Sequence, residues 1–214
     1  MISIMQPRFR ETAFSHGVSR LDQLPDDRGI EIAFAGRSNA GKSSALNRLC
    51  GRKGLARVGR TPGRTQEINV FTLPPAEDWR LIDLPGYGYA RVSAKQREHW
   101  DRLLGGYLQK RQCLAGLVLI MDVRRPLTEL DWQMLEWAGA RRLHCVLTKA
   151  DKVSRQEAQR QLHAAHARLE EAGIDASLQT FSALKDQGVE DLRGLLTEWI
   201  EEEGENTATP DQTA

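Results

Sequence analysis

The segment GRSNAGKS, residues 36–43, constrains the fold of this 214-residue chain more than any other feature. It follows the apolar run EIAFA, which predicts a buried strand, and it precedes KSSALNRLC, which predicts a helix. A glycine-rich loop in that position lets backbone N–H groups surround phosphate oxygens, and the N-terminus of the helix adds positive potential. In this pattern Lys42 reaches the β- and γ-phosphates and Ser43 offers its hydroxyl to Mg²⁺. The predicted phosphate-binding residues are Gly36, Arg37, Ser38, Asn39, Ala40, Gly41, Lys42 and Ser43.

The rest of the chain alternates predicted strands with predicted helices. This order indicates an α/β fold with a mostly parallel sheet and helices on both faces. A nucleotide-binding domain is expected over residues 31–202. Residues 1–30 have few periodic apolar positions and are expected to form an N-terminal extension with a loop. Residues 203–214 are acidic and then polar, which predicts a disordered tail.

A second candidate phosphate contact is DLPG, residues 83–86, at the end of an apolar run. Asp83 is expected to hold Mg²⁺ through water, and the Gly86 N–H is expected to touch a γ-phosphate. Small GTPases place a water-orienting glutamine directly after this glycine, but Tyr87 stands here and cannot do that work. Tyr87 and Tyr89 lie in a glycine-rich loop and are expected outside the core, where facing a partner and shielding the phosphates are both open roles. The predicted nucleotide contacts of this motif are Asp83, Leu84, Pro85 and Gly86.

Two further loops indicate a guanine base. TKAD, residues 148–151, ends an apolar strand, where the Asp151 carboxylate can accept from N1–H and the 2-amino group of guanine. Adenine has neither donor, so its binding would leave buried groups unpaired. FSAL, residues 181–184, ends the next strand, where the Ala183 N–H can bind guanine O6. All four motifs follow strands, as an open α/β ligand site requires. The predicted base-contacting residues are Thr148, Lys149, Ala150, Asp151, Phe181, Ser182 and Ala183.

Together these motifs resemble those of the EngB/YihA family of bacterial GTP-binding proteins. The likeness is carried by EIAFAGRSNAGKSS, TPGRTQEIN, LIDLPGYGYA, LTKAD and FSALK, and it extends over residues 12–200. It implies a Ras-like P-loop GTPase fold with a six-stranded, mostly parallel sheet. It also implies a GTPase that acts in assembly of the large ribosomal subunit and that is needed for normal cell division and septation.

The resemblance also assigns roles to individual residues. It implies Mg²⁺ ligands at Ser43 and Thr65, with Lys42 and Thr65 stabilising the phosphates and the switch. Thr148 stands where most GTPases have asparagine, as is usual in this family, so a hydroxyl replaces the amide that braces the base against the P-loop. Asn39 occupies the place of an ion-ligating asparagine in potassium-activated GTPases; either it holds K⁺ or it only braces the loop. The first switch is implied to comprise Gly63, Arg64, Thr65, Gln66 and Glu67.

Charge is unevenly distributed in a chain whose net charge is only +1. The stretch 36–66 contains no Asp or Glu, and it contains eight basic residues: Arg37, Lys42, Arg48, Arg52, Lys53, Arg57, Arg60 and Arg64. One possibility is that these basic side chains are simply solvated. The other is that the stretch contacts phosphate-rich RNA, because eight positive charges are more than one triphosphate needs. The expected partners are therefore GTP or GDP and a precursor of the large ribosomal subunit, with the protein itself a monomer.

Composition bounds the cellular setting. No run of about 18 apolar residues exists and the N-terminus has no apolar signal segment, so neither a membrane span nor secretion is expected. Three widely spaced cysteines fit small buried thiols in a reducing cytoplasm.

The expected activity is slow GTP hydrolysis. One rival is a nucleotide-gated scaffold at the division septum whose hydrolysis is incidental; another, an adenine-specific P-loop kinase, is disfavoured by TKAD.

Overall fold

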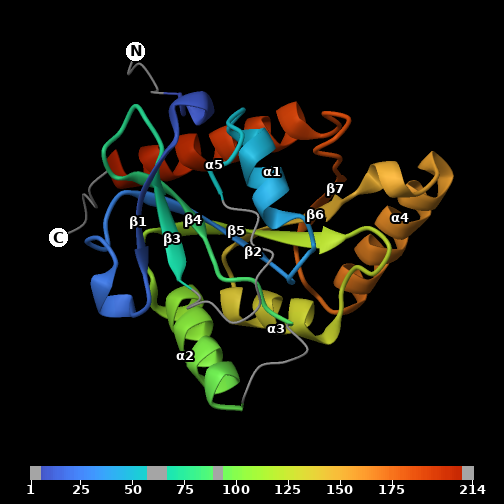
Figure 1. Cartoon of the computed structure of the whole chain (residues 1–214), viewed down its shortest axis with the longest axis horizontal. Coiled ribbons are helices and arrows are strands. Elements are labelled where there is room, and N and C mark those ends of the chain that lie inside the picture. Colours follow the sequence, from blue (N-terminus) through green and yellow to red (C-terminus); the bar gives the residue numbers. More distant parts are fainter. Residues whose placement is uncertain (1–5, 57–66, 89–93, 209–214) are drawn as a thin grey trace.

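A seven-stranded sheet forms the centre of the molecule (Figure 1). The computed structural model describes residues 6–56, 67–88 and 94–208. The sheet order is β1-β3-β4-β2-β5-β6-β7, and every pair from β4 to β7 is parallel, whereas β1, β3 and β4 pair antiparallel. The strands are β1 (Ala13–Val18), β2 (Ile30–Gly36), β3 (Ile68–Thr72), β4 (Trp79–Asp83), β5 (Leu114–Asp122), β6 (Arg142–Thr148) and β7 (Ser177–Thr180). The α/β fold is confirmed, but the expected count of six strands is wrong by one.

The additional strand is β1, which lies within the segment expected to be only an extension with a loop. It pairs antiparallel with β3 at the edge of the sheet, with Val18 opposite Ile68 and Ala13 opposite Thr72. Its first three residues are exposed and only Val18 is buried. An edge strand with so little buried surface carries no clear period-2 pattern, so its pairing with β3 was not visible in the sequence.

Helices cover both faces of the sheet (Figure 1). The helices α1 (Lys42–Leu49) and α5 (Val189–Ala208) lie on one face, and α2 (Ala94–Lys110), α3 (Glu129–Ala138) and α4 (Arg155–Glu171) lie on the other. Strand β2 supplies both cores in alternation: Ile32 and Phe34 pack with α1 and α5, whereas Ala33 and Ala35 pack with α2 and α3. This double burial is what a central parallel strand requires. Among the described helices, none is long and apolar enough to cross a membrane.

Helix α5 corrects the expectation of a disordered tail from residue 203. The helix continues through Ala208. Arg142, at the start of β6, forms ion pairs with Glu202 at 2.9 Å and Glu203 at 3.2 Å. A low-complexity acidic run has no apolar periodicity, but here the helix before it and a cation on a neighbouring strand support its helical form. Residues 209–214 lie outside the described ranges.

A buried ion cluster anchors the opposite end of the sheet from the P-loop. The Glu31 carboxylate, fully buried on β2, accepts from the Tyr107 hydroxyl at 2.8 Å and from Arg111 at 2.7 and 3.0 Å. Arg80 on β4 adds a contact at 3.2 Å. Since both carboxylate oxygens are paired, the charge is compensated and α2 is tied to the strand that carries the P-loop.

His144 makes the stability of the β6–β7 pair depend on pH. Its ring nitrogens contact Ser177 Oγ at 2.7 Å and Gln179 Oε1 at 3.0 Å, and burial lowers its pKa to about 4 from 6.5. At a pH between these two pKa values, the side chain of His144 binds a proton in the unfolded chain but not in the folded protein. The free energy of unfolding should therefore fall as pH falls from 6.5 to 4, by about 2 kcal/mol at pH 5.

Urea unfolding at pH 7 and pH 5 measures this loss, and His144→Gln should remove it. The matched control is His163→Gln on the exposed face of α4, which should keep the wild-type pH dependence. An identical pH dependence in wild type and His144→Gln would contradict the assignment.

Candidate nucleotide-binding site

The P-loop leaves β2 at Gly36 and enters α1 at Lys42. Two of its residues have left-handed backbone, Asn39 at φ 65° and Gly41 at φ 104°. A Cβ on Gly41 would lie 3.2 Å from Thr148 Oγ1, so the glycine allows both the turn and the close approach of β6. The first N–H groups of α1 consequently open toward the space enclosed by the loop, which is the geometry of an anion site.

Lys42 and Asp83 join the P-loop to the DLPG segment. Their side chains form an ion pair and are only 10% and 7% exposed. Asn69 Nδ2 lies 3.4 Å from the second Asp83 oxygen. The pairing is possible because β2 and β4 are parallel neighbours, so their carboxyl ends meet at one edge of the sheet.

The residues at this point suit Mg²⁺. Ser43, in the first turn of α1, follows Lys42 directly, and Lys42 contacts the Asp83 carboxylate. A hydroxyl and a carboxylate are the hard oxygen ligands that Mg²⁺ accepts alongside water and phosphate. The other implied ligand, Thr65, lies outside the described residues, as do Gly63, Arg64 and Gln66 of the first switch; Glu67 is described and exposed just before β3.

Thr148 braces the P-loop through its hydroxyl. Its Oγ1 hydrogen-bonds to the Ala40 carbonyl of the P-loop and lies 2.9 Å from the Met121 carbonyl of β5. The single hydroxyl proton is shared between two acceptors, so the threonine connects β5, β6 and the P-loop. A hydroxyl therefore supplies a brace at the position where most GTPases use an amide.

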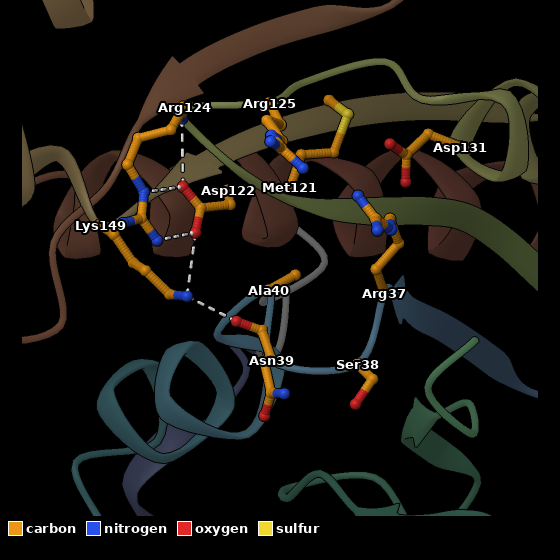
Figure 2. Close-up of a pocket in the computed structure, with 10 residues that line it drawn as sticks. All are labelled: Arg37, Ser38, Asn39, Ala40, Met121, Asp122, Arg124, Arg125, Asp131 and Lys149. Atoms are coloured by element: carbon orange, nitrogen blue, oxygen red, sulfur yellow. Dashed lines mark hydrogen bonds and ion pairs between the residues drawn. The ribbon is translucent and has the colours of Figure 1, made fainter. Parts of the chain in front are cut away.

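Lys149 forms a second brace, shown in Figure 2. It has left-handed backbone at φ 59°, and its Nζ donates to the Asn39 carbonyl at 2.5 Å and to Asp122 Oδ2 at 3.0 Å. The Asn39 side chain extends away from this contact, on the opposite side of the loop (Figure 2). Burial alone would raise the pKa of Asp122, but hydrogen bonds from Arg124 and Lys149 hold it well below its usual value.

Sequence reasoning missed Asp122 as part of the site. It is the last residue of β5 and lies opposite Thr148 in the β5–β6 register. A carboxylate at the end of a central apolar strand, followed by Arg124 and Arg125, was the available signal. These arginines and Arg37 line a cavity of about 440 Å³ between the P-loop and the β5–α3 turn (Figure 2).

The two candidate base-reading loops lie together. Ser182 Oγ donates to Asp151 Oδ1 at 2.7 Å, and the Ala150 N–H donates to the Phe181 carbonyl at 3.1 Å. The Ser182 hydrogen bond, the main cause, and the nearby Lys152 lower the pKa of Asp151, which keeps the carboxylate charged. Ala183 follows directly and is partly buried. The structure thus gathers TKAD and FSAL beside the P-loop, in the order that the parallel strands dictate.

Tyr87 departs from expectation, because its side chain is in the core. It is only 3% exposed, and its hydroxyl donates to Asp131 Oδ1 at 2.7 Å. Burial, and then the charge of Asp131, raise the pKa of Tyr87 well above its usual value, so the phenol stays protonated. The side chain neither faces solvent nor shields phosphate, because its hydroxyl is hydrogen-bonded to the buried Asp131. Tyr89 lies outside the described residues.

Several basic residues of the 36–66 stretch have structural partners. Arg48 forms an ion pair with Asp186, and Arg52 donates to the Thr12 carbonyl. Arg57, Arg60 and Arg64 lie outside the described ranges. Fewer basic side chains are therefore available to a partner than the eight counted in the sequence.

The fold and this site define a P-loop GTPase, a protein that binds GTP or GDP. A family model described as "50S ribosome-binding GTPase" matches residues 31–149. The chain belongs to the EngB family of GTP-binding proteins, as its similarity to many members shows.

Two relatives named "Probable GTP-binding protein EngB" illustrate the similarity. The relative from Nitrosomonas europaea is 50% identical over 197 residues, covering 91% of this chain and 88% of the relative. The one from Colwellia psychrerythraea is 46% identical over 204 residues, covering 94% and 90%.

Solved structures share the fold at lower identity. A crystal structure of a probable GTP-binding protein engB is 23% identical with a TM-score of 0.61, covering 80% of this chain and 99% of that one. Aquifex aeolicus Era is 18% identical with a TM-score of 0.61, covering 79% and 56%.

The brace at Thr148 leads to a binding prediction. Thr148→Val keeps the shape but removes the hydroxyl, leaving the Ala40 carbonyl without this donor, so GDP and GTP should bind roughly tenfold more weakly. Fluorescent-nucleotide titration measures the change. The matched control is Thr72→Val, whose hydroxyl lies 3.4 Å from the Ala13 carbonyl at the far edge of the sheet and should not affect binding. Equal affinities of wild type and Thr148→Val would show that the hydroxyl does not brace the P-loop.

Proposed function

We propose that the chain is a GTP-dependent switch in assembly of the large ribosomal subunit, and that this role underlies a need for it in normal cell division and septation. The observation that carries the proposal is the convergence of four loops on one site, together with membership of a family described as ribosome-binding. The protein would act as a monomer in the cytoplasm.

Guanine is read by the loops after β6 and β7. Asp151 accepts from N1–H and the 2-amino group, Ser182 holds the carboxylate in place, and the Ala183 N–H donates to O6. The 2.7 Å contact between Ser182 and Asp151 supports this arrangement. The Lys149 stem lies along the base while its Nζ remains on the P-loop carbonyl.

The phosphates are held by Lys42 and the N–H groups of residues 36–43. Ser43 and Thr65 would hold Mg²⁺, with Asp83 contacting it through water, and the ion would supply positive charge to neutralise the charge that develops on the phosphate oxygens. The P-loop backbone orients the triphosphate, and Gly63–Glu67 is the first switch, ordered by GTP and released after hydrolysis.

Hydrolysis by the isolated protein is slow, because Tyr87 replaces the water-orienting glutamine and is directed into the core. Positive charge at the phosphates must then provide the acceleration. Asn39 fits a potassium site, since its carbonyl is held by Lys149 while its exposed side chain extends to the other side of the loop. A ribosomal group is the other source of stimulation.

Hydrolysis should be faster in KCl than in NaCl at equal ionic strength, by about tenfold, which corresponds to about 1.4 kcal/mol of the barrier. Asn39→Ala should abolish the difference, because it removes the amide oxygen that would hold the ion. Phosphate release under single-turnover conditions measures the rates. Equal wild-type rates in the two salts would discard potassium and leave ribosomal stimulation.

Binding to ribosomal particles tests the main proposal. Protein loaded with a non-hydrolysable GTP analogue should co-sediment with large-subunit particles, and its affinity should fall steeply as salt rises, because phosphate contacts release counterions. Arg57→Glu combined with Arg60→Glu should reduce this binding about tenfold or more while GTP affinity stays largely intact.

The matched control is Arg102→Glu combined with Arg160→Glu, an equal charge change on the exposed faces of α2 and α4. Loss of particle binding in both pairs would indicate a general charge effect rather than a contact in the basic stretch around the first switch. Binding to division proteins without ribosomal particles would instead favour the rival, a nucleotide-gated scaffold at the septum.

A further inference from the structure

Tyr87 connects three parts of the molecule. Its carbonyl accepts from the Ser38 N–H of the P-loop at 2.7 Å, and its own N–H donates to the Gly36 carbonyl at 3.4 Å. Its side chain reaches in the other direction, to Asp131 in the first turn of α3. One residue therefore ties the segment after β4 both to the P-loop and to the core beneath it.

Asp131 is itself fixed. It is 1% exposed, and its second oxygen accepts from the Thr128 N–H at 2.8 Å and the Thr128 hydroxyl at 2.7 Å. Both carboxylate oxygens of Asp131 are thus hydrogen-bonded. The buried charge keeps all of these hydrogen bonds only when the Tyr87 hydroxyl occupies this position. We call Tyr87, Asp131 and Thr128 the Tyr87 latch.

The latch determines where Gly86 lies. A Cβ on Gly86 would be 3.6 Å from Ser38 N and Cα, so this glycine lies against the P-loop backbone. On one side the chain is held by the Lys42–Asp83 ion pair, and on the other by Tyr87. Gly88 follows with a φ of +76°, a left-handed conformation that favours glycine.

We propose that Tyr87 is a positioning residue for the γ-phosphate. The latch holds Gly86 against the P-loop before nucleotide arrives, so the Gly86 N–H meets the γ-phosphate without reorganisation. GDP lacks the γ-phosphate, so the positioning of Gly86 does not strengthen GDP binding. The latch therefore sets the ratio of GTP affinity to GDP affinity, and the inference rests on the proposed contact between Gly86 and the γ-phosphate.

The test compares two buried tyrosines that make the same kind of bond. Tyr87→Phe and Tyr107→Phe each remove a phenol hydrogen-bonded to a buried carboxylate, at 2.7 and 2.8 Å, but only Tyr87 touches the P-loop. Titrations with fluorescent GDP and a non-hydrolysable GTP analogue, and thermal unfolding, are run on each. We expect both variants to lose similar thermal stability. The ratio of GTP-analogue to GDP affinity should fall about tenfold in Tyr87→Phe alone, as expected from one lost charge-assisted contact.

Thr128→Val gives an independent measurement if Tyr87→Phe folds poorly. It loosens Asp131 but leaves the Thr128 N–H bond in place, so the affinity ratio should fall in the same direction by a smaller factor. An unchanged ratio in the folded latch variants would overturn the inference, as would an equal fall in Tyr107→Phe. The titrations contain no ribosomal particles, so failure of the ribosome-assembly proposal leaves their outcome unaffected.

Discussion

Parallel pairing around β2 is the constraint on which the rest of the structure depends. β2 lies between β4 and β5, and β6 and β7 continue the same direction. Parallel strands that start at one edge all end at the other, so the loops after β2, β4, β6 and β7 meet at one place. Their connections pass through helices that cover both faces and exclude water from the strands. The ligand site is thus a consequence of strand direction, and the core makes that direction stable.

At that edge, lysine–carboxylate pairs and shared hydrogen bonds hold the loops in position. Lys42 joins the P-loop to Asp83 at the end of β4, and Lys149 joins it to Asp122 at the end of β5. Thr148 adds a hydroxyl between two backbone carbonyls. In each of these two pairs the lysine faces a carboxylate of opposite sign, so the site keeps both cations beside the P-loop without the cost of an unpaired charge. In the proposed function, such a site is preorganised for a triphosphate.

Position 87 shows how one side chain can exchange a catalytic role for a structural one. A glutamine that orients water must face the γ-phosphate, whereas the Tyr87 ring is buried and its hydroxyl is bound to Asp131. One side chain cannot do both. The loop gains a firm connection to α3, and in the proposed function rate acceleration is left to charge around the phosphates.

The sequence by itself determined the α/β class, the P-loop and the loops that follow the strands, because glycine turns, apolar periodicity and strand–loop–helix order are local properties. It did not determine β1, which buries almost nothing at the edge and depends on pairing with β3. It also did not show the role of Asp122, which depends on the register that places it beside Thr148.

Only the tertiary structure decided that Tyr87 is buried. A tyrosine in a glycine-rich loop has no local reason to enter the core; it does so because Asp131, 44 residues away, provides a buried acceptor already held by Thr128. The same reasoning applies to the acidic end of α5, which is supported by Arg142 on β6. Whether a polar side chain is buried depends on partners distant in sequence, since a polar group can leave water only where its hydrogen bonds are replaced.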